Sequence, residues 1–305
     1  MNLKIVHNGE DITDKLKFSS CYLYDRYGGM LDSLTIEFPE DKTDFIFGQY
    51  DEISVITDSY NTGIMYIDDV FFNKGRYIIS AIPYKQSNKQ KTSGVWKNIQ
   101  FSKMAKDISL NNGLELKMYG VKDVTYKSLT RINEYDLEFL NRISKREGCS
   151  IKIYNNELII FNEKHIENDY KALDISVEDV DPDYSFKIAT NGAGGVTVQY
   201  FDIETDEFIS YTAEDKNIEG GMMVITEHLK DVGEAQRFAN GYLRNFNKNE
   251  ITGTISVNLN SNISACTLLN LQNFSEFSGQ YVVYEVTHDI LNEKTIIKIR
   301  KTLTY

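Results

Sequence analysis

The four histidines are the first residues whose chemistry suggests a site, because imidazole serves as a metal ligand and as an acid or base near neutral pH. They stand far apart, with no H-x-x-x-H or HExxH spacing, so a metal site would have to be assembled from distant loops. Surface or hydrogen-bonded structural positions are the favoured interpretation. The four residues are His7, His165, His228 and His288.

Acidic side chains are dense around residues 204–215, and two such carboxylates could act as the catalytic pair of a glycosidase. That chemistry requires a fixed separation between two carboxylates, and sequence density says nothing about separation. A hydrated acidic surface is the favoured interpretation. No serine lies in a G-x-S-x-G nucleophile elbow. The acids concerned are Glu204, Asp206, Glu207, Glu214 and Asp215.

The stretch Gly192-Ala-Gly-Gly195 is rich enough in glycine to suggest a phosphate cradle. It lacks the Lys-Ser/Thr pair of a P-loop, and the residues that follow have a strand pattern instead of a helical one. We therefore interpret it as a loop. The sequence predicts no catalytic residue, no cofactor and no metal site.

The cysteines Cys21, Cys149 and Cys266 are odd in number and have no CxxC spacing, so neither structural zinc nor a disulfide framework is expected. Residues 1–7 lack the apolar run of a signal peptide, and no segment is long and apolar enough to span a bilayer. These features predict synthesis and folding in a reducing cytoplasm, without membrane insertion.

The formal net charge of −12 argues against a nucleic-acid reader, because phosphate binding needs clustered basic residues. The basic stretch of Lys85, Lys89, Lys91 and Lys97 is interpreted as a solvated loop. An acidic wall facing a channel would repel DNA and let it slide past as cargo. That use is a hypothesis.

The elements that must position any site show an internal repeat, because the two ends of the chain carry the same strand pattern. Gly63, Met65, Ile67, Asp69 and Val70 fall in register with Gly279, Tyr281, Val283, Glu285 and Val286. Each set is followed by a turn and an Ile-Ile strand, and only that final turn differs in length. A ring of three such chains would offer six similar surfaces to a sixfold partner.

The fold class predicted is mainly β, with two related tube-like β-barrels and a small inserted α+β domain. Residues 1–87 form the first barrel, because short strands alternate there with turn signals. The polar stretch at residues 85–94 is expected to be a linker or long loop. The strands of the first barrel are expected near residues 3–5, 21–24, 34–38, 53–57, 64–70 and 77–82, with a turn at Asn73-Lys-Gly75.

Residues 88–165 contain the linker and the α+β domain. Phe101, Met104, Ala105 and Ile108 make an apolar stripe at helical spacing. In a second helix Asn133 is expected to be the cap, Ile132 and Leu137 a hydrophobic staple, and Gly148 the end. Asn155-Asn156 then predicts a two-residue hairpin turn.

Residues 166–305 are assigned to the second barrel, with a hairpin near residues 196–211. A helix at about residues 231–247 is expected to cover this barrel. Asp231 and Glu234 form its capping box. Its one apolar face is made of Val232, Ala235, Phe238, Ala239, Tyr242 and Phe246.

This arrangement resembles the baseplate hub proteins of contractile phage tails, the late control protein D group. It is also similar to the hub part of type VI secretion spike proteins and of phage-tail-like bacteriocins. The resemblance runs over nearly the whole chain and is most specific at residues 136–148 with the following hairpin, and at residues 279–288.

The resemblance implies a non-enzymatic homotrimer whose two barrels per chain form a pseudo-sixfold ring. The ring would contact the hexameric tail tube protein, the trimeric central spike protein and other baseplate components, in a virion tail or an extracellular tail-like particle. Two departures stand out. The sequence does not run on into a lysozyme-like or needle domain, so we expect any spike or cell-wall hydrolase to be a separate chain. Ala265-Cys266 stands where relatives often have a glycine.

Two other functions remain open. A tail-associated peptidoglycan hydrolase would use acids such as Glu214 or Glu227, and a tail-tip module would bind glycans through the middle domain.

Overall fold

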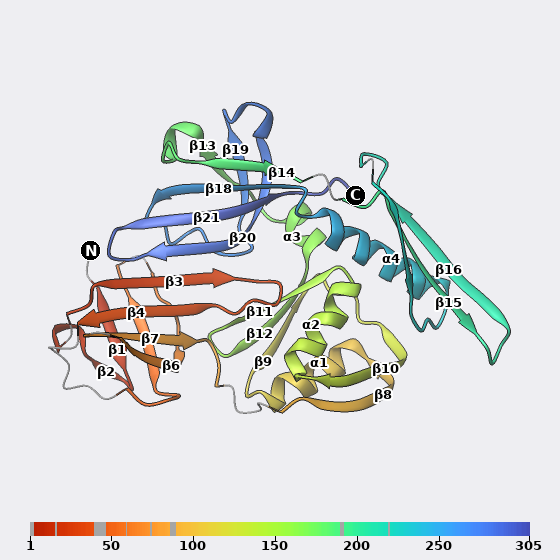
Figure 1. The fold of residues 1–305 in the computed structure, drawn as a ribbon, viewed down its shortest axis with the longest axis horizontal. Coiled ribbons are helices and arrows are strands. Elements are labelled where there is room, and N and C mark those ends of the chain that lie inside the picture. The colour runs from red at the N-terminus through yellow and green to blue at the C-terminus, as the bar shows by residue number, and fades with distance from the viewer. Residues whose placement is uncertain are drawn as a thin grey trace.

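The strands at the two ends of the chain belong to one large sheet (Figure 1). The computed structural model describes residues 3–15, 17–39, 47–58, 60–73, 75–85, 90–189, 192–218 and 220–305. The N-terminal strands are β1 (Lys4–His7), β2 (Glu10–Asp11), β3 (Ser20–Arg26), β4 (Ser33–Pro39), β5 (Glu52–Ile56), β6 (Met65–Asn73) and β7 (Arg76–Ile82). The C-terminal strands are β13 (Leu173–Ser176), β14 (Ser185–Ile188), β18 (Ile251–Asn258), β19 (Leu268–Gln272), β20 (Gly279–Asp289) and β21 (Lys294–Lys301).

The two sets of strands repeat the same order of neighbours. The first set runs β3-β4-β7-β6-β5-β1, and the second runs β14-β18-β21-β20-β19-β13. Corresponding neighbours are antiparallel in both sets, except that β13 is parallel to β19 whereas β1 is antiparallel to β5. The internal repeat is therefore present in the topology as well as in the sequence pattern.

An irregularity in the strand pairing falls at the same place in both copies. The register between β6 and β7 shifts between Ile67 and Asp69, and the register between β20 and β21 shifts between Val283 and Glu285. These are the positions that the sequence pattern aligns. A β-bulge bends a strand and re-aims its end, so both copies bend at corresponding residues.

The described strands do not close into two barrels, which corrects the predicted fold class. The reason is the length of β20: its first half pairs with β19, and residues 285–289 pair with residues 22–26 of β3. This pairing joins the two copies into one open sheet of thirteen strands. The mainly β class itself is confirmed.

The middle of the chain folds as an α+β unit, shown in yellow and green in Figure 1. The stripe of Phe101, Met104, Ala105 and Ile108 is buried as predicted. Asn155 and Asn156 form the predicted hairpin turn, with φ angles of 47° and 61°. The elements are β8 (Thr92–Gln100), α1 (Phe101–Asn111), β9 (Glu115–Tyr119), β10 (Thr125–Glu134), α2 (Asp136–Arg146), β11 (Cys149–Tyr154), β12 (Glu157–Asn162) and α3 (Glu163–Asp169).

Two details of this unit differ from the prediction. Helix α2 begins after Tyr135, whose backbone N–H donates to Glu138 Oε2 at 3.3 Å, and not after Asn133. Ile132 is 72% exposed, so it does not form the predicted staple. Gly148 does end the helix region in the left-handed conformation, with a φ angle of 68°.

Parts of the predicted linker and of one predicted turn lie outside the described residues. These parts are residues 86–89 of the 85–94 stretch and residue 74 of the turn at residues 73–75. The end of the same polar stretch, from Thr92, already belongs to β8.

The third unit consists of a small sheet and a long helix: β15 (Gly195–Asp202), β16 (Glu207–Glu214), β17 (Met222–Thr226) and α4 (Val232–Asn247). Asp231 caps α4 as predicted, because its Oδ1 accepts from the backbone N–H of Glu234 at 2.8 Å. The predicted capping box is not completed, because Glu234 Oε2 accepts from the N–H of Lys230 instead of that of Asp231. The helix packs against β15, β16 and α2, and its buried residues share one apolar core with the middle unit. It therefore covers a different sheet from the predicted one, and two residues of its predicted apolar face, Val232 and Phe246, are 54% and 44% exposed.

Gly241 allows α4 to cross the end of α2 closely. A methyl group on its Cα would overlap the backbone carbonyl of Arg146. We expect Gly241→Ala to lower the free energy of unfolding by about 1–3 kcal/mol through overpacking, despite roughly 1 kcal/mol gained in helix propensity.

Gly233→Ala, in the same helix, is the matched control for urea unfolding. Its methyl group would meet only a side-chain oxygen of Asp231, at 3.1 Å. It should leave stability unchanged or raised. Equal losses in the two variants would contradict the close crossing.

Candidate assembly surfaces

The histidines that the sequence singled out lie in separate places. His7 Nε2 is 2.9 Å from Asp51 Oδ2, and the His165 ring pairs with Asp169 in α3. The ring of His228 lies 4.9 Å from that of Tyr200, and His288 is fully buried in β20. Within the described ranges, no group of three or more His, Cys, Asp or Glu residues could hold a metal ion.

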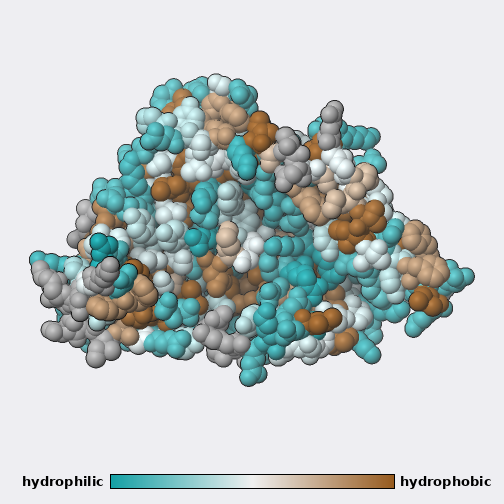
Figure 2. Space-filling view, in the orientation of Figure 1, coloured by the Kyte–Doolittle hydropathy of each residue, from teal (hydrophilic) through white to brown (hydrophobic). Residues whose placement is uncertain are grey.

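The acidic stretch follows the β15–β16 hairpin. Glu204 and Asp206 lie at its turn, Glu207 and Glu214 lie at the two ends of β16, and Asp215 comes next and is buried. Its apolar residues Phe201, Ile203 and Phe208 are exposed. Figure 2 shows apolar surface at the right-hand end of the molecule, where Figure 1 places this hairpin, with hydrophilic surface around it.

One pocket, of about 270 Å³, brings Glu227 together with Glu234 and His228. Glu227 Oε2 accepts from Arg146 Nη1 at 2.6 Å, and Glu234 Oε2 accepts from the backbone N–H of Lys230 at 2.6 Å. Burial raises the pKa of Glu234. Glu227 thus pairs with the end of α2, and Glu234 in the first turn of α4 binds the backbone just before that helix.

The segment Gly192–Gly195 packs against a second glycine loop. A methyl group on Gly194 would overlap the carbonyl of Gly220, and a methyl group on Gly220 would overlap the carbonyl of Gly192. Gly195 leads into β15, a strand. The glycines therefore allow a close approach of two backbones. The prediction of a loop is confirmed for residues 192–194, whereas Gly195 already belongs to β15.

The three cysteines are free thiols, Cys21 and Cys149 buried and Cys266 partly exposed. Cys266 has a φ angle of 78°, and its N–H donates to the carbonyl of Val283 at 2.8 Å. The left-handed conformation that a glycine would supply is thus adopted by Cys266. Among the described helices, none is long and apolar enough to cross a membrane.

The second half of β6 is an open strand edge with apolar side chains. On one side β6 pairs with β7 along its length, whereas on the other β5 pairs only with its first two residues. Within the described residues, no strand pairs with that second side of residues 69–73. Val70, Phe71 and Phe72 are 38%, 53% and 49% exposed there. An open edge with exposed apolar side chains invites pairing with another chain.

A second open edge belongs to β14, which pairs with β18 only, as far as the described strands go. Ile188 is 57% exposed, and Phe186 stacks on Phe277 with ring centroids 4.5 Å apart. Beside this strand lies a groove of about 660 Å³ whose charged lining residues are Lys145, Lys187, Lys248 and Arg300. In Figure 1, β14 lies at the top of the sheet, and β6 lies toward its lower end.

The joint between β3 and β20 is the buried counterpart of these open edges. His288 lies in it opposite Leu23, with its Nδ1 3.0 Å from Thr295 Oγ1 and its ring 4.7 Å from that of Tyr60. Burial lowers the pKa of His288 to about 4. The joint therefore contains a histidine that stays neutral.

The neutral His288 predicts acid sensitivity. An unfolded chain binds a proton at this residue below about pH 6.5, whereas the folded chain does so only near pH 4. Stability should therefore fall as the pH drops from 6.5 to 4, by on the order of 3 kcal/mol. Urea unfolding at a series of pH values should show this slope reduced by about one proton in His288→Gln, and an unchanged slope would contradict the assignment.

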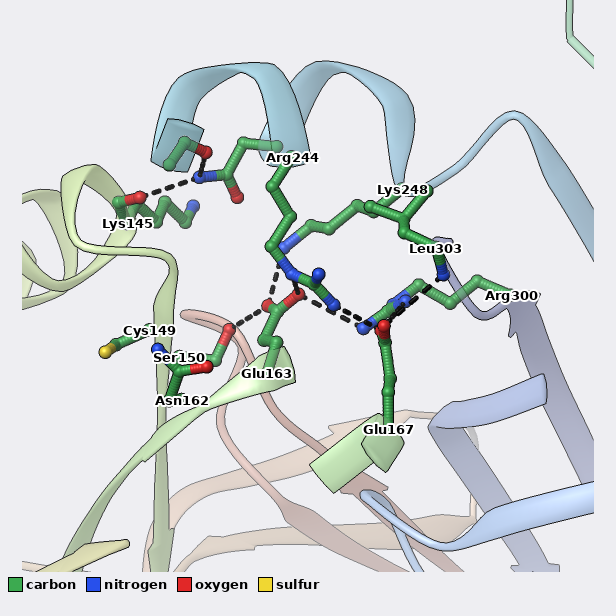
Figure 3. Close-up of polar contacts among 12 residues, drawn as sticks. Lys145, Cys149, Ser150, Asn162, Glu163, Glu167, Arg244, Lys248, Arg300 and Leu303 are labelled. Carbon is green, nitrogen blue, oxygen red and sulfur yellow. Dashed lines mark hydrogen bonds and ion pairs between the residues drawn. The ribbon is translucent and has the colours of Figure 1, made fainter. Parts of the chain in front are cut away.

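A buried ionic cluster ties the three units together (Figure 3). Glu163 and Glu167 project from α3 toward Arg244 and Lys248 of the α4 region and Arg300 of β21. Arg300 lies 2.7 Å from Glu167 and 3.1 Å from Glu163, and Lys248 lies 2.8 Å from Glu163. Arg244 pairs with both carboxylates.

The charges of the cluster set its pKa values. Burial would raise the pKa of Glu163, but Lys248, Arg300 and Arg244 outweigh burial and hold this pKa well below its ordinary value. Burial lowers the pKa of Lys248, which forms an ion pair with Glu163. Glu163 is thus the central anion of the cluster.

A second buried contact joins the first repeat to the middle unit. Lys152 of β11 donates to Asp25 of β3 and to Asp32 at 2.8 Å, and Asp25 also accepts from the N–H of Ala265 at 3.1 Å. Burial raises the pKa of Asp32 to about 6. Sequence reasoning missed both buried clusters, because their members lie far apart along the chain and share no motif.

Comparisons with solved structures place the fold. The chain aligns over 98% of its length with 98% of a 43 kDa tail protein of prophage MuSo2 from Shewanella oneidensis, at 12% identity and a TM-score of 0.75. It aligns over 98% of its length with 96% of a tail protein from Neisseria meningitidis MC58, at 9% identity and a TM-score of 0.76.

A third similar structure is an E. coli component of the type VI secretion system that exhibits structural similarity to T4 bacteriophage tail proteins gp27 and gp5. The alignment covers all of this chain and 78% of that one, at 10% identity and a TM-score of 0.60. No family model and no curated protein matches the sequence. The resemblance to tail hub proteins is thus confirmed for the fold.

Proposed function

We propose that this chain is a structural baseplate hub of a contractile, tail-like injection particle. Three copies form a ring, and the two repeats of each copy supply six similar units. The ring adapts a hexameric tail tube to a trimeric central spike. The fold that this chain shares with tail proteins supports a place in a tail-like particle. The duplicated strand order supports the adapter role.

The duplication is the observation that carries this proposal. A sixfold partner presents six equivalent surfaces. A threefold ring of chains that each had a single copy of the sheet could match only three of them. Two copies of one sheet in each chain solve that mismatch, because the copies match in strand order and in the position of a bulge. The parts of the chain outside the two sheet copies do not have to be repeated, so they can follow the threefold symmetry.

The partners of the proposed hub are the tube protein, the spike protein and other baseplate components. The chain would be made in the cytoplasm and then become part of a virion or of an extracellular tail-like particle such as a bacteriocin. DNA would pass only as cargo. The net charge of −12 suits a channel wall that does not retain it.

The test is the oligomeric state in solution and in particles. Light scattering and sedimentation of the purified chain, alone and with its spike protein, should give a trimer in at least one of the two conditions. A stable monomer retained in intact particles would overturn the proposal.

Glu227 and Glu234 favour one competing function, because two carboxylates share a pocket there. A peptidoglycan hydrolase would clear cell wall in a zymogram and lose that activity in Glu227→Gln. We propose the non-enzymatic role because both carboxylates already accept hydrogen bonds within the chain, Glu227 from Arg146 and Glu234 from the backbone N–H of Lys230. Clearing by the native chain would overturn it. Glycan binding by the middle unit would indicate a tail-tip module instead.

A further inference from the structure

We propose that residues 69–73 of β6 pair antiparallel with β14 of a second copy, in a register that the intramolecular joint of β3 and β20 defines. This inference rests on the proposed ring and names the contact that closes it. The register follows from the internal repeat, because β6 and β14 are the repeat equivalents of β20 and β3, which pair within the chain.

The first step is the equivalence of β6 and β20. Met65, Ile67 and Asp69 correspond to Tyr281, Val283 and Glu285, with the bulge at the same place. In both strands the first part pairs with a short neighbour, β5 or β19. The second part of β20 is covered by β3, whereas no described strand covers the second part of β6. Residues 70 and 72 of β6 therefore correspond to residues 286 and 288 of β20.

The second step is the equivalence of β3 and β14. Each is the first strand in its copy of the shared order, beside β4 or β18. Leu23 pairs with Leu34, which pairs with Ala81 of β7. In the other copy, Phe186 pairs with Gly253, which pairs with Ile299 of β21. Ala81 and Ile299 both face the last residue before the bulge, so Phe186 corresponds to Leu23 and Ile188 to Asp25.

The third step transfers the register of the joint. Val286 faces Asp25 and His288 faces Leu23 within the chain. Between chains, Val70 then faces Ile188, and Phe72 faces Phe186. Phe71 faces Lys187, and Asn73 faces Ser185. This register was fixed by backbone pairing alone, yet it places apolar side chains opposite apolar side chains, as cross-strand contacts require.

The surroundings of the two edges complement each other. The ring of Phe72 packs on Tyr77 with centroids 5.0 Å apart, and the ring of Phe186 stacks on Phe277, so the pairing joins two aromatic groups. Asp69 would lie diagonally across from Lys187, within reach of a long side chain. Pairing also covers the side chains of Phe71 and Ile188, which are more than half exposed in the single chain.

The two edges are different surfaces: β14 is the first strand in the order of the sheet, whereas the open half of β6 lies beside β7, before β5, β1 and β2. Each copy would therefore offer one edge and accept the other. Such a head-to-tail contact forms a ring when its rotation closes. In the ring, three joints within chains would alternate with three joints between chains.

The test uses cysteine pairs in the full chain. Val70→Cys with Ile188→Cys, and Phe71→Cys with Lys187→Cys, place thiols on directly facing residues of both faces. Val70→Cys with Ser185→Cys is the control, because three residues of offset is about 10 Å, beyond the reach of a disulfide. The single-cysteine variants control for the native thiols.

After mild oxidation, the facing pairs should give covalent trimers on a non-reducing gel, and the control pair should give only monomers. Unchanged circular dichroism shows that each variant is folded. A trimer in light scattering without cross-linking of either facing pair would overturn this register while leaving the hub proposal intact. A chain that stays monomeric at every concentration, with and without its spike, would overturn both.

Discussion

Replacing Glu163 by glutamine is expected to lower the free energy of unfolding by about 3–5 kcal/mol. The substitution leaves the three buried cations of the cluster with Glu167 as their remaining carboxylate, and Glu167 pairs with Arg244 and Arg300 but not with Lys248. The native cluster holds two carboxylates and three cations. The substitution keeps the shape of the side chain and removes only its charge. Glu163, Arg244 and Arg300 are each less than 10% exposed, so water cannot replace the lost interaction.

A second variant tests the electrostatic cause. Lys248 has Glu163 as its ion-pair partner, so Lys248→Met added to Glu163→Gln should recover part of the loss. Glu37→Gln breaks an exposed pair with Arg76 and should cost about 1 kcal/mol or less. Urea unfolding measures all three. Additive losses in the double variant would contradict the account.

The same carboxylate predicts a pH dependence. The folded-state pKa of Glu163 lies below its unfolded value of about 4.5, so its contribution is complete above that pH and is lost as the pH falls toward the folded-state pKa. This acid loss should be absent from Glu163→Gln. It is separate from the loss due to His288, which begins nearer pH 6.5.

The second large effect concerns assembly. We expect the double substitution Val70→Lys and Phe72→Lys to raise the dissociation constant of the trimer at least about 100-fold, which is roughly 2.7 kcal/mol. Lysines on an edge strand block pairing with another chain, and they would be buried against Phe186 and Ile188. Both residues are substantially exposed in the single chain, so the monomer should keep its stability.

The matched control places two lysines on another exposed apolar surface, Phe201→Lys with Phe208→Lys on the β15–β16 hairpin. Sedimentation over a range of concentrations should show a native trimer for the control and a monomer for the edge variant. Equal weakening by both would mean that general charge, and not the β6 edge, governs assembly.

Local signals predicted most of the elements. Alternating apolar residues gave the strands of both repeats, the stripe from Phe101 to Ile108 gave α1, and Asp231 gave the start of α4. The Asn155-Asn156 turn and the glycine after α2 were also predicted, because each depends on a backbone conformation that few residues adopt. These signals act over a few residues and can be read from the sequence.

Long-range pairing could not be predicted in the same way. Nothing in the periodicity of β20 indicates that its second half pairs with β3 instead of closing its own barrel. The apolar face of α4 fits any sheet, so its place on β15 and β16 was not evident. The open edges of β6 and β14 could not be predicted for the same reason. A strand edge is open when no other strand pairs with it, and this depends on the long-range pairing of the whole sheet. The repeat was the exception, since equal spacing at both ends of the chain is itself a sequence signal.

The symmetry of the assembled ring tests the central claim most directly. Electron microscopy of the purified trimer, or of particles containing this chain, should show a threefold ring in which six similar sheet segments alternate around the axis. A ring of six separate chains, or a threefold ring in which the two repeats of each chain lie at different distances from the axis, would contradict the account.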